Sequence, residues 1–136
     1  MTEITLRFVQ RLSYRQYQDV AFEIQLSRPP AGDTPVLVKL DTGSDYCVFH
    51  RLHAERMGLT VESGTLQRFR TAAGSFNAYG HEVTLALGNL EWEATVFFAE
   101  PDNFPINVVG RIGFLDHLQI GLVDYEQQLY LSPYEP

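Results

Sequence analysis

Short segments with a two-residue apolar period constrain the fold of this chain most strongly. In residues 20–26 a large apolar side chain occupies every second position, and the same alternation recurs in residues 83–87. Successive side chains of a β-strand point to opposite faces, so this period predicts strands with one buried face. Residues 28–33 are rich in Pro, Gly and Asp, which is typical of a loop between strands.

The strands expected from these patterns are short and follow one another closely. We predict them over residues 4–8, 20–26, 36–40, 46–49, 66–70, 77–87, 92–99, 106–109, 118–123 and 128–131. Residues 50–57 are the best helix candidate, with Gly58 placed to end it, and residues 114–117 fit one helical turn. The pattern predicts a mainly β protein, barrel-like or a folded sandwich, with one or two short helices. No linker or repeat is evident, so we expect residues 1–136 to form a single domain.

A carboxylate follows directly where the apolar segment 36–40 stops. Asp41 begins the tripeptide Asp-Thr-Gly, in which Thr42 can hydrogen-bond locally and Gly43 permits a turn or a close backbone approach. A carboxylate at the end of a rigid strand is a good catalytic group, because the scaffold fixes its position. The tripeptide alone favours a simpler interpretation, in which Asp41 ends a strand and caps its own turn.

Composition and charge argue against several classes of function. The 136 residues are 45% hydrophobic and 20% charged, an ordinary balance for a soluble globular protein. The formal charge of -7 argues against a nucleic-acid partner, because phosphate binding needs a basic face. No apolar segment approaches the length that spans a bilayer, so we expect no membrane association. The start of the sequence lacks the basic-then-apolar order of a signal peptide, and a single cysteine is compatible with a reducing compartment; we expect a cytoplasmic location.

Cys47 and the histidines are further candidates for reactive or metal-binding groups. Cys47 lies in the apolar segment 46–49, which indicates a buried structural thiol, since no activating base is evident. His50 and His53 are three residues apart, whereas two metal ligands on a helix are more often four apart. We therefore expect no metal and no cofactor, with ligation by these two histidines as the alternative.

Two motifs give the chain a resemblance to a known family. Residues 40–44, Leu-Asp-Thr-Gly-Ser, are followed far downstream by Val108, Val109, Gly110 and Arg111. Together they resemble the two signatures of retropepsin-like aspartic proteases, and the resemblance extends over most of the chain. It implies a closed, barrel-like retropepsin fold and hydrolysis of peptide bonds without a metal or organic cofactor.

Peptide hydrolysis by aspartates needs two carboxylates in one site. One is charged and takes a proton from water, while the other is neutral and donates to the scissile carbonyl. The chain has one Asp-Thr-Gly, because the sequence Asp33-Thr34-Pro35 lacks the glycine. A twofold dimer places the same residue of each subunit across its axis. The resemblance implies this solution: a homodimeric aspartic endopeptidase with two Asp41 carboxylates, acting on extended polypeptides.

The resemblance also implies roles for the neighbours of Asp41. Thr42 would link the two active-site loops across the dimer axis, and Gly43 would let the substrate backbone approach. Ser44 would hydrogen-bond the carboxylate and tune its acidity.

The second motif would support this turn from below. Gly110 would pack beneath the active-site loop, and Asp45 would form a buried ion pair with Arg111. Without the family resemblance, Asp45 and Arg111 are better interpreted as unrelated surface charges.

The segment Thr71-Ala72-Ala73-Gly74-Ser75 separates two predicted strands. Its order and small residues resemble the flap of the family, a lid that closes over an extended peptide and excludes water. An ordinary hairpin turn has the same composition.

Three features depart from the retroviral pattern. Ile112 stands where retroviral proteases usually carry Asn or Asp, the hairpin tip lacks a dense glycine run, and the N-terminal segment is longer. We therefore expect a cellular or bacterial relative. Two alternatives to an active peptidase stay open: a catalytically silent peptide-binding or dimerisation module, and a β-barrel in which the motif occurs by chance.

Overall fold

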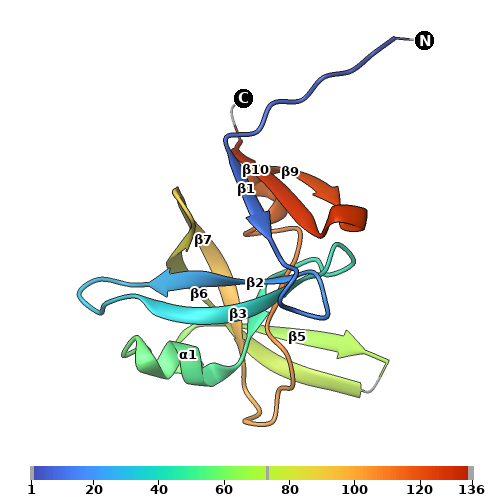
Figure 1. Cartoon of the computed structure of the whole chain (residues 1–136). Helices are drawn as coiled ribbons and strands as arrows, with labels where there is room; N and C mark the ends of the chain where they lie inside the picture. The colour runs from blue at the N-terminus through green and yellow to red at the C-terminus, as the bar shows by residue number, and fades with distance from the viewer. Residues whose placement is uncertain (1, 73, 135–136) are drawn as a thin grey trace.

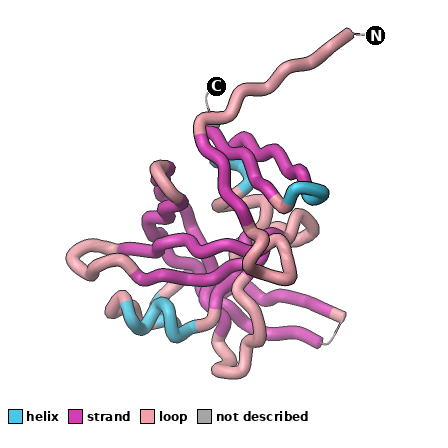
Figure 2. Tube along the Cα trace, in the orientation of Figure 1, coloured by secondary structure: helices cyan, strands magenta, loops and turns pink. Residues whose placement is uncertain are grey.

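The computed structural model describes residues 2–72 and 74–134, and this part of the chain is built mainly of strands (Figures 1 and 2). The strands are β1 (Gln10–Ser13), β2 (Ala21–Ser27), β3 (Thr34–Leu40), β4 (Val48–Phe49), β5 (Thr65–Thr71), β6 (Gly74–Leu87), β7 (Leu90–Ala99), β8 (Val108–Val109), β9 (Leu118–Val123) and β10 (Gln128–Pro133). One helix, α1 (Arg51–Arg56), and 3₁₀ turns at Val61–Ser63, Leu115–His117 and Asp124–Glu126 complete the described elements. The mainly β class predicted from the sequence is confirmed.

The larger of two sheets has the strand order β2-β3-β8-β4-β7-β6-β5. β2 also pairs with β6, so the run of pairings from β2 to β6 returns to its starting strand, and β5 extends from β6 as a hairpin. β3 with β8 and β4 with β7 are parallel pairs, whereas the β5–β6–β7 meander is antiparallel. The smaller sheet, β1-β10-β9, stands at one end of the molecule near both chain ends (Figure 1).

The core forms where the two-residue period turns apolar side chains inward. On β2, Phe22, Ile24 and Leu26 are buried, and on the neighbouring β3 Val36 and Val38 face the same interior. Residues of both sheets belong to this cluster, from Tyr14 to Leu131. Burying these side chains is the main favourable term that holds the strands in register.

The predicted helix is present and has a cap at each end. His50 precedes it, and the ring Nδ1 of His50 accepts a hydrogen bond from the backbone N–H of Leu52 at 3.0 Å. Gly58, with φ of +77°, turns the chain where the helix stops, as expected for a glycine in the left-handed region. Among the described residues no helix is long and apolar enough to cross a membrane.

The strand predicted over residues 4–8 is wrong. Residues 2–6 run as an extended tail away from the sheets (Figure 1), and Ile4 and Leu6 are 85% and 59% exposed. Arg7 and Phe8 contact the small sheet without forming a strand: the Arg7 carbonyl accepts from Gln119 and Ser132, and the Phe8 ring packs against Tyr130. β1 instead spans Gln10–Ser13, where no strand was predicted, and its first residue pairs with Leu131 of β10. Alternation gives a segment two faces, but a strand also needs a neighbour for its backbone hydrogen bonds, and β10 ends two residues further, at Pro133.

Candidate active site

Asp41 stands immediately after β3, at the point where the sheet gives way to a tight turn. Its backbone N–H donates to the carbonyl of Val109 at 2.9 Å, and its own carbonyl accepts from Ser44 at 3.1 Å. Its carboxylate oxygen Oδ1 accepts the backbone N–H of Gly43 at 3.0 Å. The turn-capping hydrogen bond expected of a plain Asx turn is therefore present, and it fixes the orientation of an exposed carboxylate.

The second motif lies beside the Asp41 turn because β8 pairs in parallel with the end of β3. Lys39 and Leu40 are opposite Val108 and Val109, and Val109 is fully buried. This register brings two segments about 70 residues apart in sequence to one place, as the resemblance implies.

Gly110 lies directly beneath the turn that follows Asp41. A Cβ atom at this position would be 2.3 Å from the carbonyl oxygen of Ser44 and 2.6 Å from that of Tyr46. The next two residues, Arg111 and Ile112, donate their backbone N–H groups to the carbonyls of Ser44 and Asp45, at 2.9 and 2.8 Å. Only glycine permits this close contact between two backbone segments.

The side chains of Thr42 and Ser44 differ in their surroundings. Thr42 is exposed at the turn. The Ser44 hydroxyl donates to the carbonyl of Tyr46 at 2.7 Å, so it braces the turn instead of making the hydrogen bond to the carboxylate that was expected. A hydroxyl has one proton to donate, and here the backbone carbonyl of Tyr46 accepts it.

Asp45 and Arg111 form the expected ion pair, with Arg111 Nη1 3.8 Å from Asp45 Oδ1. Within the single chain the pair is not buried as expected, because the Arg111 and Asp45 side chains are 69% and 73% exposed. In this setting solvent screens the attraction, and such a pair contributes about 0–1 kcal/mol.

A cleft of about 990 Å³ separates the Asp41 turn from the β5–β6 hairpin. Asp41, Gly43 and Ser44 line one side, and Thr71, Gly74 and Ser75 of the predicted flap line the other. The Thr71 hydroxyl donates to the carbonyl of Gly74 at 3.0 Å and ties the ends of the two strands together. Ala72 is exposed, and Ala73 lies outside the described residues.

Aromatic side chains form the apolar part of the cleft. Phe69 and Phe76 stack at 5.4 Å across the hairpin, Phe76 contacts Phe104 at 5.1 Å, and Tyr46 meets Phe97 edge-on at 5.0 Å. They rest on a small apolar cluster separate from the main core. Sequence reasoning missed Phe104; the available signal was a lone aromatic residue between two prolines, in a loop.

Cys47 and His53 lie outside this chemistry. Burial raises the pKa of the Cys47 thiol to about 12, which keeps it protonated and unreactive. Burial lowers the pKa of His53, which is half-buried on α1. Within residues 2–72 and 74–134 no group of three or more His, Cys, Asp or Glu side chains is arranged to hold a metal ion.

The described chain thus combines a mainly β fold with an Asp-Thr-Gly turn in a cleft that a β-hairpin also lines. Residues 31–123, well over half of the chain, match the aspartyl protease family, and the chain belongs to that family. No curated protein matches the chain.

Two solved structures illustrate the fold. A retropepsin-like aspartic protease from Rickettsia conorii superposes with a TM-score of 0.64 at 16% identity, over 91% of this chain and 99% of that one. The EIAV protease, solved with the inhibitor HBY-793, gives a TM-score of 0.56 at 21% identity, over 74% of this chain and 88% of that one. The fold is therefore retropepsin-like.

Proposed function

We propose that this chain is an aspartic endopeptidase in which two copies each contribute Asp41 to one catalytic pair. The observation that carries the proposal is the place of Asp41: an exposed carboxylate, fixed by its own turn, at the edge of a cleft that the β5–β6 hairpin lines from the other side. Membership of the aspartyl protease family gives this carboxylate its chemical precedent.

The need for a second copy follows from the carboxylates of the cleft. Among the described lining residues, Asp41 and Asp45 are the acidic ones, and Asp45 is paired with Arg111. A single chain thus supplies one uncommitted carboxylate where the reaction uses two. A twofold axis beside the Asp41 turn brings the same residue from each copy into one site.

The chemistry of such a pair follows from the repulsion of like charges. Two carboxylates in contact do not both ionise, so one keeps a proton while the other stays charged. The charged carboxylate takes a proton from water as the water oxygen attacks the carbonyl carbon of the peptide. The neutral carboxylate gives its proton to the carbonyl oxygen, which yields a tetrahedral intermediate. Collapse of the intermediate breaks the C–N bond. The leaving nitrogen takes the proton that the first carboxylate removed from water, and the second carboxylate recovers its proton from a hydroxyl of the intermediate.

The substrate supported by this cleft is an extended polypeptide. β5 is the last strand of the larger sheet, so one of its edges is available to pair with a peptide backbone. Side chains of the bound peptide would alternate between the aromatic part of the cleft and solvent.

Substitution of Asp41 by Asn tests the proposal, because it keeps the size and the turn-capping oxygen but removes the charge. We expect Asp41→Asn to fold and dimerise like the wild type and to lose cleavage of a mixed peptide library between about pH 4 and 7, by about 10³-fold or more. Asp33→Asn is the matched control, because Asp33 also precedes a threonine but is exposed on a loop. The control should retain full activity.

Light scattering at several protein concentrations tests the shared site. Activity per chain should fall on dilution together with the dimer fraction. Full activity in Asp41→Asn would remove Asp41 from the mechanism, and an active strict monomer would refute the shared pair. A dimer that neither cleaves peptides nor binds a statine-type transition-state mimic would instead be the silent module.

A further inference from the structure

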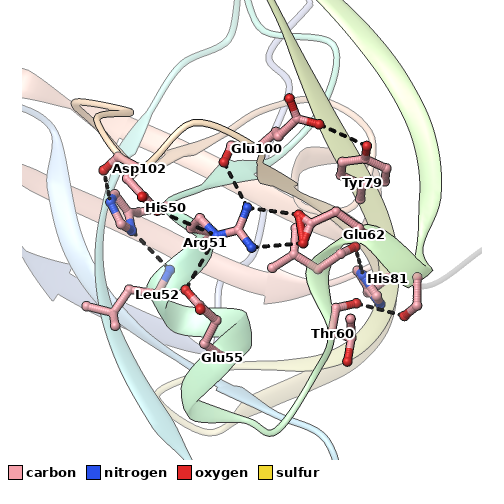
Figure 3. Close-up of polar contacts among 12 residues, drawn as sticks. His50, Arg51, Leu52, Glu55, Thr60, Glu62, Tyr79, His81, Glu100 and Asp102 are labelled. Carbon is pink, nitrogen blue, oxygen red and sulfur yellow. Dashed lines mark hydrogen bonds and ion pairs between the residues drawn. The ribbon is translucent and has the colours of Figure 1, made fainter.

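The loop of residues 100–107 joins β7 to β8 and lies between the cleft and the start of α1. In Figure 1 it hangs between α1 and the β5–β6 hairpin. One side lines the cleft with Pro101, Asn103, Phe104, Pro105 and Ile106. The other side faces the start of α1 and is held there by polar contacts of His50 and Arg51 (Figure 3).

Arg51 is the centre of these contacts. Its two terminal nitrogens donate to the two carboxylate oxygens of Glu62, both at 2.9 Å, and Nη1 also donates to the carbonyl of Glu100 at 2.8 Å. Nε lies 3.6 Å from the Asp102 carboxylate and 3.5 Å from that of Glu55. The Arg51 side chain is only 17% exposed, so these contacts are shielded from solvent on its side.

His50 holds the loop at two more points. Its backbone N–H donates to Oδ1 of Asn107 at 2.8 Å, at the far end of the loop. Its ring Nδ1 accepts the N–H of Leu52, so in the neutral ring the proton is on Nε2, which donates to the carbonyl of Asp102. His50 and Arg51, at the start of α1, thus form hydrogen bonds with the loop at Glu100, Asp102 and Asn107.

The loop also contacts the β5–β6 hairpin. Phe104 packs against Phe76 of β6, with ring centroids 5.1 Å apart, and Phe76 stacks on Phe69 of β5. Glu100, the first residue of the loop, accepts a hydrogen bond from the Tyr79 hydroxyl of β6 at 2.9 Å. A displacement of the loop from α1 would therefore move the aromatic wall of the cleft.

We infer that His50 and Arg51 are positioning residues that set the affinity and side-chain selectivity of the cleft by fixing loop 100–107. The inference rests on the proposed peptidase function, and it adds residues that do not touch the reacting atoms. Arg51 is the more important of the two because three carboxylates, those of Glu55, Glu62 and Asp102, surround its guanidinium. Without Arg51 these like charges would repel one another, and the carbonyl of Glu100 would lose its donor.

Peptide kinetics with Arg51→Ala test this inference. The experiment compares pairs of peptides that carry either Phe or Ala at one position and are otherwise identical. One pair is made for each position near the scissile bond. We expect KM for the best Phe peptide to rise about tenfold while kcat changes less than about twofold, and the preference for Phe over Ala to shrink. Arg51→Lys keeps the positive charge but loses the planar guanidinium that binds two oxygens at once. The KM of this variant should therefore lie between those of the wild type and Arg51→Ala.

Arg56→Ala is the matched control, because it removes an arginine from the same helix. Arg56 is exposed and has no ion pair among the residues that the structure describes. It should match the wild type in KM and selectivity. Unchanged KM and unchanged Phe preference in a folded Arg51→Ala would overturn the inference.

A second variant and a second measurement cover poor folding of Arg51→Ala. Asp102→Ala removes a 93% exposed carboxylate from the loop and leaves the Arg51–Glu62 contact in place; it should shift KM in the same direction by a smaller factor. Hydrogen exchange should be faster for amides 100–107 in both variants, with unchanged rates in β2 and β3. If the wild type cleaves no peptide, the proposed function fails, and exchange alone decides the inference: equal rates in loop 100–107 would overturn it.

Discussion

Two arginines stand behind different walls of the cleft, and they support these walls in different ways. Arg111, behind the Asp41 turn, contributes chiefly its backbone N–H to the carbonyl of Ser44, while its side chain forms one exposed ion pair. Arg51, behind loop 100–107, contributes its side chain. The guanidinium forms a two-pronged contact with one carboxylate, donates to a backbone carbonyl and lies near two further carboxylates. The Asp41 turn is thus held by backbone contacts and loop 100–107 by side-chain charge.

This difference has a functional consequence. Backbone contacts such as those around Gly110 allow little change of sequence or position, which suits a carboxylate that must be placed precisely. Side-chain contacts allow substitution and adjustment, which suits a wall that meets different substrates. Three predictions test this division, in addition to the Asp41 and Arg51 variants above.

Gly110→Ala should have the largest effect, because it acts on the backbone contacts of the turn. The added methyl would lie 2.3 Å from the Ser44 carbonyl oxygen, and overpacking of this kind costs about 3 kcal/mol. The free energy of unfolding in urea measures the loss, and peptidase activity should fall with it. Gly32→Ala is the matched control, since a Cβ there meets nothing within 4 Å. Equal unfolding midpoints for Gly110→Ala and Gly32→Ala would show that the turn moves to accommodate the added methyl at little cost in stability.

Arg111→Ala should have a much smaller effect on the single chain. Its backbone N–H stays in place, and the lost ion pair is exposed, so the monomer should lose less than about 1 kcal/mol. Urea unfolding below the dimer dissociation constant measures this value. Repeating it at high concentration sharpens the comparison: a loss above about 3 kcal/mol there would mean that the dimer buries the pair, and that both arginines act through side-chain charge.

The smallest expected effect is a pH dependence of the loop support. The Arg51 hydrogen bond lowers the pKa of Glu62, so this carboxylate stabilises the fold above the ordinary glutamate pKa and loses that contribution as pH falls through its lowered value. The difference in unfolding free energy between wild type and Glu62→Gln should amount to a few tenths of a kcal/mol at pH 7, because Glu62 is 45% exposed, and should vanish in acid. A difference that grows on acidification would contradict this sign.

Much of the fold could be predicted because its signals are local. Alternation placed β2, β3 and the β5–β6 hairpin within a few residues of their observed bounds, and Gly58 marked the end of α1. Residues 4–8 have an equally good alternation but pair with no strand in the described part of the chain, and no local pattern reveals whether a segment will find a partner.

The candidate site divides in the same way. Asp41 and Gly110 belong to motifs whose spacing is readable in the sequence, and the structure places them together. Arg51 and Phe104 belong to no motif, because their roles arise from contacts between segments about 50 and 30 residues apart. The direction of the Ser44 hydroxyl was not predictable either, since it depends on which acceptor the folded turn places within its reach.

The pairing of β1 with β10 has a consequence for folding during synthesis. Gln10 lies opposite Leu131, so β1 pairs with a segment that is synthesised about 120 residues later. Closing so long a loop is entropically costly, and contacts of high sequence separation slow folding. The larger sheet, whose β2–β3 and β5–β6–β7 pairings are local, can assemble during synthesis. The small sheet can form only after translation reaches β10, so residues 10–13 spend that interval exposed to chaperones and proteases.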